Sequence, residues 1–182
     1  MGLEPSASCG IGLNTALTPE QRERYQNEDV IRGLLTSCRT IAIVGLSSDP
    51  QKASYFVASY LQYAGYRIIP VTPRSGEILG CPSYPTLAAV PEKIDLVDVF
   101  RPAGEVSGLV DQAVAVGAKA IWTQLRIVDF AAADKALAAG LKVVMDKCVK
   151  MEHGRYHGGL HSAGMNTEIL SARRSRLPGE KE

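Results

Sequence analysis

The chain has 182 residues, a length that fits about one globular domain. Its composition is 46% hydrophobic and 21% charged, which permits an ordinary buried core and excludes a chain that is disordered throughout. The formal net charge of +1 provides no strong field for recruiting nucleic acid or an anionic membrane.

Neither a membrane anchor nor a secretory leader is expected. No run approaches the roughly 18 apolar residues of a membrane helix, and the start lacks the features of a signal peptide. The four cysteines are far apart and form no C-x-x-C pair or paired metal spacing. We therefore expect a soluble, cytoplasmic protein whose thiols are reduced.

Residues 1–17 mix Gly, Ser, Pro and Thr without periodicity and are expected to form a flexible tail. A helix start follows, with Thr18 as N-cap, Pro19 in the first turn and Gln21 three residues after the cap. This helix is predicted to run to about Ser37, because apolar residues recur along one of its sides.

The body of the chain then alternates between strands and helices. Strands are expected at 40–45, 67–72, 95–99, 119–123 and 142–145. Helices are expected at 54–64, 104–116 and 130–139, each followed by a glycine that can cap it. The pattern predicts an α/β fold, a Rossmann-like doubly wound sheet of five parallel strands in the order 3-2-1-4-5, with the N-terminal helix added.

We place the domain at 18–152 and a C-terminal extension at 153–182. His153, His157 and His161 are spaced four residues apart, so they can line one helical face as metal ligands. Gly158-Gly159 argues against a helix, and no carboxylate or cysteine is in register with the histidines. A solvated extension without a metal site is therefore expected.

Residues 40–56 indicate a buried strand, a sharp turn at Gly45 and a new helix. This passage presents backbone N–H groups and the positive end of a helix to a phosphate. Its loop lacks the further glycines of the dinucleotide fingerprint, so an NAD site is not indicated. An ordinary turn with a serine cap is the alternative. Polar side chains that can contact phosphate are Ser47, Ser48, Lys52 and Ser54.

The end of the second strand bears on which nucleotide is bound. An NAD enzyme carries an acid there for the ribose hydroxyls, but here the strand ends Val71-Thr72-Pro73-Arg74. Arg74 suits a phosphate on the ribose, as in NADP or coenzyme A, and Pro73 offers a flat surface to an adenine. A plain surface arginine in a turn is the alternative.

Other candidates follow the later strands. Arg101 can contact a ligand phosphate or carbonyl, or it can pair with Asp98 or Glu105 as part of the structure. Trp122 can pack in the core or contact a ligand arm. Cys148, after the fifth strand, is a possible neighbour of a ligand thiol.

No catalytic constellation is recognisable in the chain. The Gly-x-Ser-x-Gly elbow, the Walker A lysine motif and His-Glu-x-x-His are absent, and the histidines all lie in the C-terminal extension. The carboxylates at the strand ends are scattered rather than paired. We therefore do not expect an enzyme.

A series of motifs in order carries a resemblance to a known family: Ile-Val-Gly-Leu-Ser-Ser-Asp-Pro, Arg-Ile-Ile-Pro-Val-Thr-Pro, Gly-Cys-Pro-Ser-Tyr-Pro-Thr-Leu, Asp-Leu-Val-Asp-Val-Phe-Arg, Ala-Ile-Trp-Thr-Gln-Leu and Gly-Leu-Lys-Val-Val-Met-Asp-Lys-Cys. The chain resembles the small stand-alone CoA-binding proteins of bacteria and archaea over about residues 38–153. Their fold is similar to the CoA-binding domain of the succinyl-CoA synthetase alpha subunit and of ADP-forming acyl-CoA synthetases.

The resemblance implies three groups of CoA contacts. The diphosphate would be held by Gly45, Leu46, Ser47, Ser48, Lys52 and Ser54. The adenosine and its 3′-phosphate would be flanked by Val71, Thr72, Pro73 and Arg74. The pantetheine side would be faced by Phe100, Arg101, Trp122 and Gln124. Two positions depart from the family pattern, since Thr72 replaces the usual Asn and Arg126 replaces the usual Gly.

The leading hypothesis is thus a protein that binds coenzyme A or an acyl-CoA and performs no chemistry itself. One alternative is an NADP-dependent oxidoreductase, which would need a substrate domain and a proton donor that the sequence does not reveal. Another is a nucleotide-sensing regulatory subunit whose N-terminal helix docks on a partner. A homo-oligomer is compatible with each.

Overall fold

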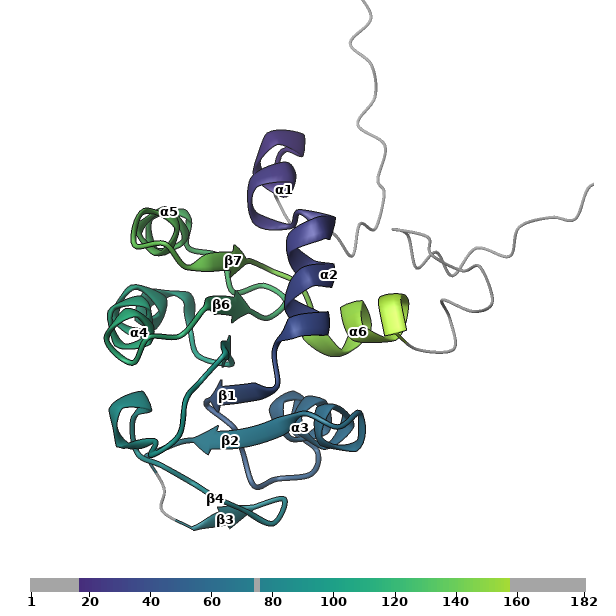
Figure 1. Ribbon diagram of the computed structural model, residues 1–182, viewed down its shortest axis with the longest axis vertical. Helices are drawn as coiled ribbons and strands as arrows, with labels where there is room; N and C mark the ends of the chain where they lie inside the picture. Colours follow the sequence, from purple (N-terminus) through teal and green to yellow (C-terminus); the bar gives the residue numbers. More distant parts are fainter. Residues whose placement is uncertain (1–16, 74–75, 158–182) are drawn as a thin grey trace, which may run out of the picture.

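The computed structural model describes residues 17–73 and 76–157 (Figure 1). Its helices are α1 (Pro19–Tyr25), α2 (Glu28–Ser37), α3 (Ala53–Tyr63), the 3-10 turn η1 (Leu87–Ala89), α4 (Ala103–Ala115), α5 (Phe130–Ala138) and α6 (Val149–His157). Its strands are β1 (Thr40–Val44), β2 (Arg67–Val71), β3 (Glu77–Ile78), β4 (Cys81–Pro82), β5 (Leu96–Val99), β6 (Ala120–Thr123) and β7 (Lys142–Val144). Within the described ranges no helix has the length and apolar character needed to cross a bilayer.

The α/β architecture with five parallel strands is confirmed, but the predicted strand order is wrong. The sheet runs β2-β1-β5-β6-β7, which is 2-1-3-4-5 when its five strands are counted along the chain. β1 pairs with β2 on one side and with β5 on the other, in the registers Thr40↔Arg67 and Ile41↔Leu96. The third strand of the sheet therefore lies beside the first and not beyond the second.

The outer edge of β2 explains this order. The backbone N–H of Tyr84 donates to the Pro70 carbonyl at 3.0 Å, and that of Thr72 donates to the Tyr84 carbonyl at 2.9 Å. These groups point away from β1, so the ring of Pro70 removes a donor from the outer side of the strand. A proline at that position suits an edge strand, and the segment after the β3–β4 hairpin covers what remains of the edge.

The strand order moves the expected ligand crevice. After β1 the chain passes through α3 to β2, which lies toward one edge of the sheet. After β5 it passes through α4 to β6, which lies toward the opposite edge. In doubly wound sheets a ligand binds outside the carboxyl ends of the strands where these connections diverge. That point lies between β1 and β5.

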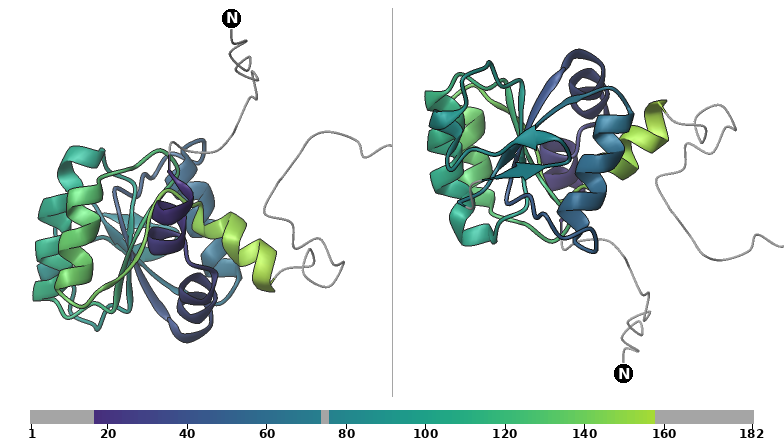
Figure 2. Two further views of the ribbon diagram at one scale, coloured as in Figure 1. Left: turned by 90° about the horizontal axis from the view of Figure 1, so that it is seen from above. Right: turned by 90° about the horizontal axis from the view of Figure 1, so that it is seen from below.

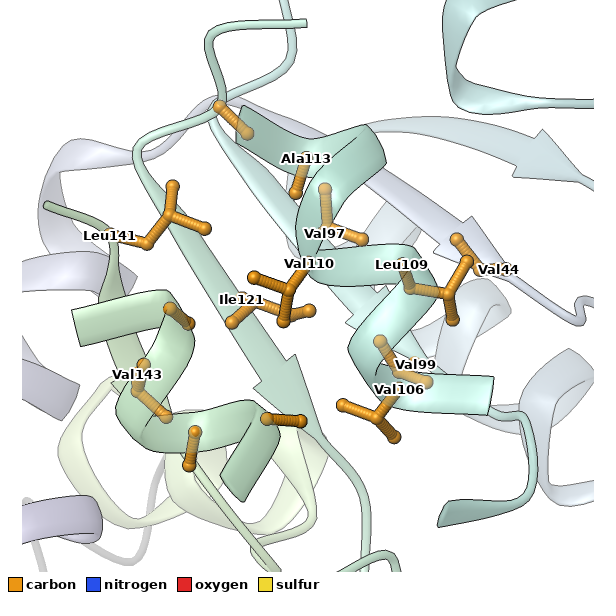
Figure 3. Packing of buried hydrophobic residues seen from close by; sticks show 14 of the residues in the cluster. Val44, Val97, Val99, Val106, Leu109, Val110, Ala113, Ile121, Leu141 and Val143 are labelled. Atoms are coloured by element: carbon orange, nitrogen blue, oxygen red, sulfur yellow. The ribbon is translucent and has the colours of Figure 1, made fainter. Parts of the chain in front are cut away.

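Two layers of helices cover the sheet, with α4 and α5 on one face and α2, α3 and α6 on the other (Figure 2). Alternate strand residues face opposite layers because side chains alternate along a strand. Val97, Val99 and Ile121 pack against Val106 and Val110 of α4 (Figure 3). Ile41, Ile43 and Leu96 are buried in the second cluster, on the other face of the sheet. Burial on both faces accounts for the mainly apolar strands.

The predicted single helix up to Ser37 is wrong, since it is divided into α1 and α2. The Asn27 side chain accepts the N–H groups of Asp29 and Val30, which begins a new helix at that point. The Tyr25 carbonyl accepts the N–H of Met145 at 2.9 Å, so the segment is attached to its own domain. This packing weakens the alternative in which the helix docks on a partner. Apart from buried Leu17, the predicted tail at 1–17 lies outside the described residues.

The start of the predicted solvated extension is instead helical. The predicted boundary at residue 153 falls inside α6, whose Val149, Glu152 and Tyr156 are buried. The Glu152 carboxylate forms ion pairs with Arg155 at 3.1 Å and Lys147 at 3.6 Å. The glycines that argue against a helix come directly after α6 in the sequence, and they lie outside the described residues together with His161.

Candidate ligand-binding site

The loops that follow β1 and β5 meet at Gly45. A Cβ atom on this residue would lie 2.6 Å from the Phe100 carbonyl oxygen and 2.9 Å from Cδ of Arg101. Its φ of 88° also lies in a region that favours glycine. The sharp turn predicted at Gly45 is present, and the close approach of the two loops requires a glycine there whether or not a ligand is bound.

The loop between Gly45 and α3 is held by its own side chains. The Ser54 hydroxyl accepts the N–H of Ser47 at 3.1 Å, and the Ser47 hydroxyl accepts the N–H of Asp49 at 3.1 Å. Each hydroxyl group uses its oxygen in these bonds and keeps its own hydrogen for donation. The loop is thus shaped before any ligand arrives, with Ser48 exposed beside it.

Both helices that begin at the switch point lack a side-chain cap. Lys52 is the N-cap residue of α3 and Pro102 that of α4, and neither makes a side-chain cap bond. By contrast, Thr18, Asn27 and Asp129 cap α1, α2 and α5 with side-chain oxygens. First-turn N–H groups without a cap side chain can donate to an anion, and the helix dipole adds a favourable potential.

Arg101 has a partner within the protein. Its guanidinium forms two hydrogen bonds of 2.9 Å with the carboxylate of Glu105, one turn along α4. The two side chains are 42% and 46% exposed, and ion pairs at such positions contribute little free energy. The structural alternative considered for Arg101 is therefore realised, and exchange of Glu105 for a ligand anion would cost little.

A groove of about 390 Å³ lies between α3 and the loops after β5 and β6. Its lining is mostly apolar and includes Val57, Phe100, Pro102, Leu125 and Cys148. Burial raises the pKa of the Cys148 thiol, which keeps this group protonated near neutral pH. The groove can thus accept an uncharged, flexible chain.

The polar side of this groove is formed by Gln124, whose Nε2 donates to Oδ1 of Asp98 at 2.7 Å. Asp98 is 0% exposed, and its second carboxylate oxygen has no hydrogen-bond partner among the described residues. Burial raises the pKa of Asp98 to about 7. This aspartate therefore acts on the groove through the orientation that it imposes on Gln124.

The residues after β2 are arranged partly as predicted. Val71 is buried, Thr72 is half-buried with its N–H donated to Tyr84, and Pro73 is exposed. Pro73 therefore presents a free surface at the carboxyl end of β2. The predicted contact residue Arg74 lies outside the described residues, so its role stays a prediction.

The structure does not bring two of the predicted contact residues to the site. Trp122 is 0% exposed, and its indole N–H donates to the Lys147 carbonyl at 2.6 Å. Leu46 is also buried, in the same apolar cluster as Trp122. The core alternative therefore holds for Trp122, and Leu46 has only backbone groups to offer a ligand.

Arg126 occupies a position where the family pattern has glycine. The positive φ of the backbone at this position explains why glycine is usual there. Its φ of 66° lies in the left-handed region, and its N–H donates to Oδ1 of Asp146 at 2.6 Å. The arginine thus adopts a conformation typical of glycine, while its side chain is exposed. Arg126 is not among the residues that line the groove between α3 and the loops after β5 and β6.

Sequence reasoning missed Val57 and the apolar side of α3. Val57 follows Ala53 by four residues, and both line the groove, as positions on one helical face do. Asp98 was considered as a possible partner of Arg101 and as one of several scattered carboxylates, and not as a buried group beside a groove. A carboxylate in the middle of an otherwise apolar strand was the available signal, because such a group is buried with a partner or has a shifted pKa.

Comparison with known proteins agrees with this geometry. The family described as CoA binding domain matches residues 39–154, which is more than half of the chain. The chain belongs to the CoA-binding domain family. Its matched segment begins just before β1 and ends within α6, so it contains the whole parallel sheet and the switch point.

The chain is similar to two kinds of protein. Uncharacterized protein YneT of Bacillus subtilis is 35% identical over 123 residues, which are 68% of this chain and 91% of YneT. An ADP-forming acetate–CoA ligase of Archaeoglobus fulgidus is 25% identical over 154 residues, which are 79% of this chain but only 21% of the ligase. The chain therefore spans about a fifth of that enzyme and has nearly the extent of YneT.

Solved structures give the same result for the CoA-binding domain. A hypothetical protein from Pyrococcus horikoshii OT3 is 37% identical with a TM-score of 0.69, over 71% of this chain and 91% of that one. A protein from Thermus thermophilus is 33% identical with a TM-score of 0.67, over 71% and 98%. The predicted resemblance to small stand-alone CoA-binding proteins is thus confirmed.

Proposed function

We propose that this protein binds coenzyme A, free or as an acyl thioester, at the switch point between β1 and β5, and that it carries no catalytic step of its own. Membership in the CoA-binding domain family supports the ligand class. The observation that carries the proposal is the adjacency of a helix end without a side-chain cap and an apolar groove: Ala53, the first residue of α3, also lines the groove, and Val57 continues the groove wall one turn later.

The diphosphate lies at the first turn of α3 in this proposal. The N–H groups there have no cap side chain, and the hydroxyl hydrogens of Ser47 and Ser54 remain free to donate. Lys52 is exposed at the same helix end and adds a positive charge. These groups are typical of a phosphate site at a helix N-terminus.

The pantetheine arm occupies the groove beyond the helix end. Pantetheine is flexible, largely uncharged and has two amides, which suits an apolar wall with one amide side chain at its edge. Since the side-chain NH₂ group of Gln124 donates a hydrogen bond to Asp98, the side-chain oxygen of Gln124 is available to accept an amide N–H from the ligand. Cys148 then lies near the thiol end of the arm.

The absence of catalysis is proposed from the placement of the titratable groups near the groove. Asp98 is fully buried behind Gln124, which donates to its carboxylate, and burial keeps the Cys148 thiol protonated. Neither forms a nucleophile–base pair with a neighbour among the described residues. A protein that holds, buffers or delivers CoA fits these features.

The test is isothermal titration of the full chain, freed of carried-through nucleotide, with CoA, acetyl-CoA, NAD and NADP. We expect one site with micromolar or tighter affinity for CoA and no measurable binding of NAD or NADP. Equal affinity for CoA and acetyl-CoA would indicate that the acyl group is not selected. Binding of NADP without CoA would establish the oxidoreductase alternative.

Arg74 supplies a second test, directed at the adenosine end. Arg74→Ala is expected to weaken CoA about tenfold or more and dephospho-CoA little, because only CoA has the 3′-phosphate that the guanidinium would bind. Arg39→Ala, at the opposite end of the sheet, is the matched control and should change neither affinity. Equal losses for both ligands in Arg74→Ala would remove this residue from the proposed role.

A further inference from the structure

A second hollow, of about 580 Å³, lies at the opposite end of the molecule from the CoA groove. Its lining includes Arg39, Gly65 and Tyr66, which come just before β1 and β2 and so mark the amino ends of these strands. α6 reaches this end with its last turns and contributes His153 and His157. Two imidazoles therefore line one hollow.

The spacing of the two imidazoles suits a single metal ion. His153 and His157 are one turn apart on α6, and their ring centroids are 5.2 Å apart. With Zn–N bonds of about 2.0–2.1 Å, each ring centre lies roughly 3.2 Å from the ion, and a tetrahedral angle then separates the centres by roughly 5.2 Å. The spacing of two histidine ligands is thus present without rearrangement of the helix.

Tyr60 of α3 holds the inner histidine. Its hydroxyl group lies 3.0 Å from Nδ1 of His153, and its ring makes an edge contact with the imidazole at 5.5 Å. Tyr66 makes a second edge contact at 5.5 Å. When Nδ1–H donates to the phenol oxygen, Nε2 keeps its lone pair, and metal-binding histidines are commonly oriented by such a bond.

Arg39 lines the same hollow as the two histidines. Its positive charge opposes a cation at close range, so it suits a water molecule or a small anion in the coordination positions that the histidines leave open.

We propose that His153 and His157 form a binding site for one divalent transition metal ion, such as Zn²⁺, with Tyr60 as the residue that orients His153. Two coordination positions remain for water or an anion. Among residues 17–73 and 76–157, no group of three or more His, Cys, Asp or Glu is arranged for a metal. In this site the two protein ligands are His153 and His157, one turn apart near the end of α6.

The test is titration of the EDTA-stripped full chain with ZnCl₂ by calorimetry, together with long-range ¹H–¹⁵N spectra of the imidazoles. We expect one Zn²⁺ per chain, changed nitrogen shifts at His153 and His157, and a higher melting temperature of the protein. CoA affinity should be unchanged by Zn²⁺, since the hollow lies away from the CoA groove. The two proposals can therefore fail independently.

Three variants make the assignment specific. His157→Ala should weaken Zn²⁺ by about a hundredfold or more, because chelation by two linked ligands is lost. Tyr60→Phe should weaken it about tenfold while keeping both ligands. His161→Ala, which removes the third histidine of the sequence, should bind as the parent does. Unchanged affinity in His157→Ala, or a loss confined to His161→Ala, would overturn the proposal.

Discussion

The side-chain amide of Gln124 donates to the buried carboxylate of Asp98 across 2.7 Å, beside the groove at the switch point. The Asp98 side chain points from β5 toward the α2, α3 and α6 layer, and Cys148 and the Gln124 amide lie near it. A buried carboxylate with one amide partner is poorly solvated in its charged form. Its protonation is therefore expected to make the stability of the fold depend on pH.

Asp98→Asn is expected to change the pH dependence of stability. The pKa of Asp98 is about 7 in the folded protein, above its value of roughly 4 in an unfolded chain. The folded state therefore binds more protons between these values, and the contribution of Asp98 to stability is lost as pH rises from about 4 to 7. The asparagine variant should lack this slope and be more stable than the parent at pH 8, by on the order of 1 kcal/mol or more.

Urea unfolding of parent and variant at pH 5, 6, 7 and 8 measures this difference directly. The difference between the two proteins isolates Asp98 from the other titrating groups, since they are common to both. A parent and a variant with parallel pH profiles would show that Asp98 is ionised in the folded protein throughout this range.

Gly45→Ala should destabilise the fold by roughly 2–4 kcal/mol, because the new Cβ meets the Phe100 carbonyl at 2.6 Å and the backbone has a positive φ. Gly140→Ala is the matched control, since Gly140 has a similar φ of 85° but open space around it. We expect a cost of only about 1 kcal/mol there. Equal losses of free energy of unfolding would mean that the loop contact at Gly45 does not constrain the residue.

Leu125→Asp should weaken CoA binding at least about tenfold, because a charge on the groove wall must be desolvated when the pantetheine arm enters. Leu125 is 46% exposed, so the fold should tolerate the change. Val114→Asp introduces the same charge at a 42% exposed valine on α4, outside the groove lining. That variant should bind CoA like the parent, and parallel losses in both would argue against a groove-specific effect.

Arg126→Gly is expected to raise the free energy of unfolding by about 0.5–1 kcal/mol. The residue has a φ of 66°, and glycine relieves that strain while its N–H can still donate to Asp146. Arg126→Ala removes the side chain but keeps the strain, so its stability in urea unfolding should match the parent. A gain of stability in the alanine variant equal to that in the glycine variant would assign the effect to the side chain instead.

The candidate site could be predicted from the sequence only in part. The Gly45 loop, the helix end at Lys52 and the cation at Arg101 were found because phosphate sites follow local rules of strand, turn and helix. The groove was found only in part: Phe100, Gln124 and Cys148 were expected near the pantetheine arm, and all three line it. Its wall on α3 was missed, because Val57 meets the loops after β5 and β6 only when the sheet is assembled. For Trp122 the sequence left core packing and a ligand contact both open, because a strand-end position does not reveal which way a side chain points; the resemblance alone placed it beside the ligand.

By itself, the sequence determined which segments form the five parallel strands and the helices between them. Through its ordered motifs it also determined membership in the CoA-binding domain family. Those features rest on hydrophobic periodicity, glycine caps and short loops, which act between neighbours along the chain. The tertiary structure decided the strand order, the division at Asn27, the burial of Asp98 and the meeting of His153 with Tyr60. These depend on which edge of β2 is available and on contacts between residues far apart in sequence. Local propensities do not specify such contacts, because burial and hydrogen bonding across the folded domain choose among them.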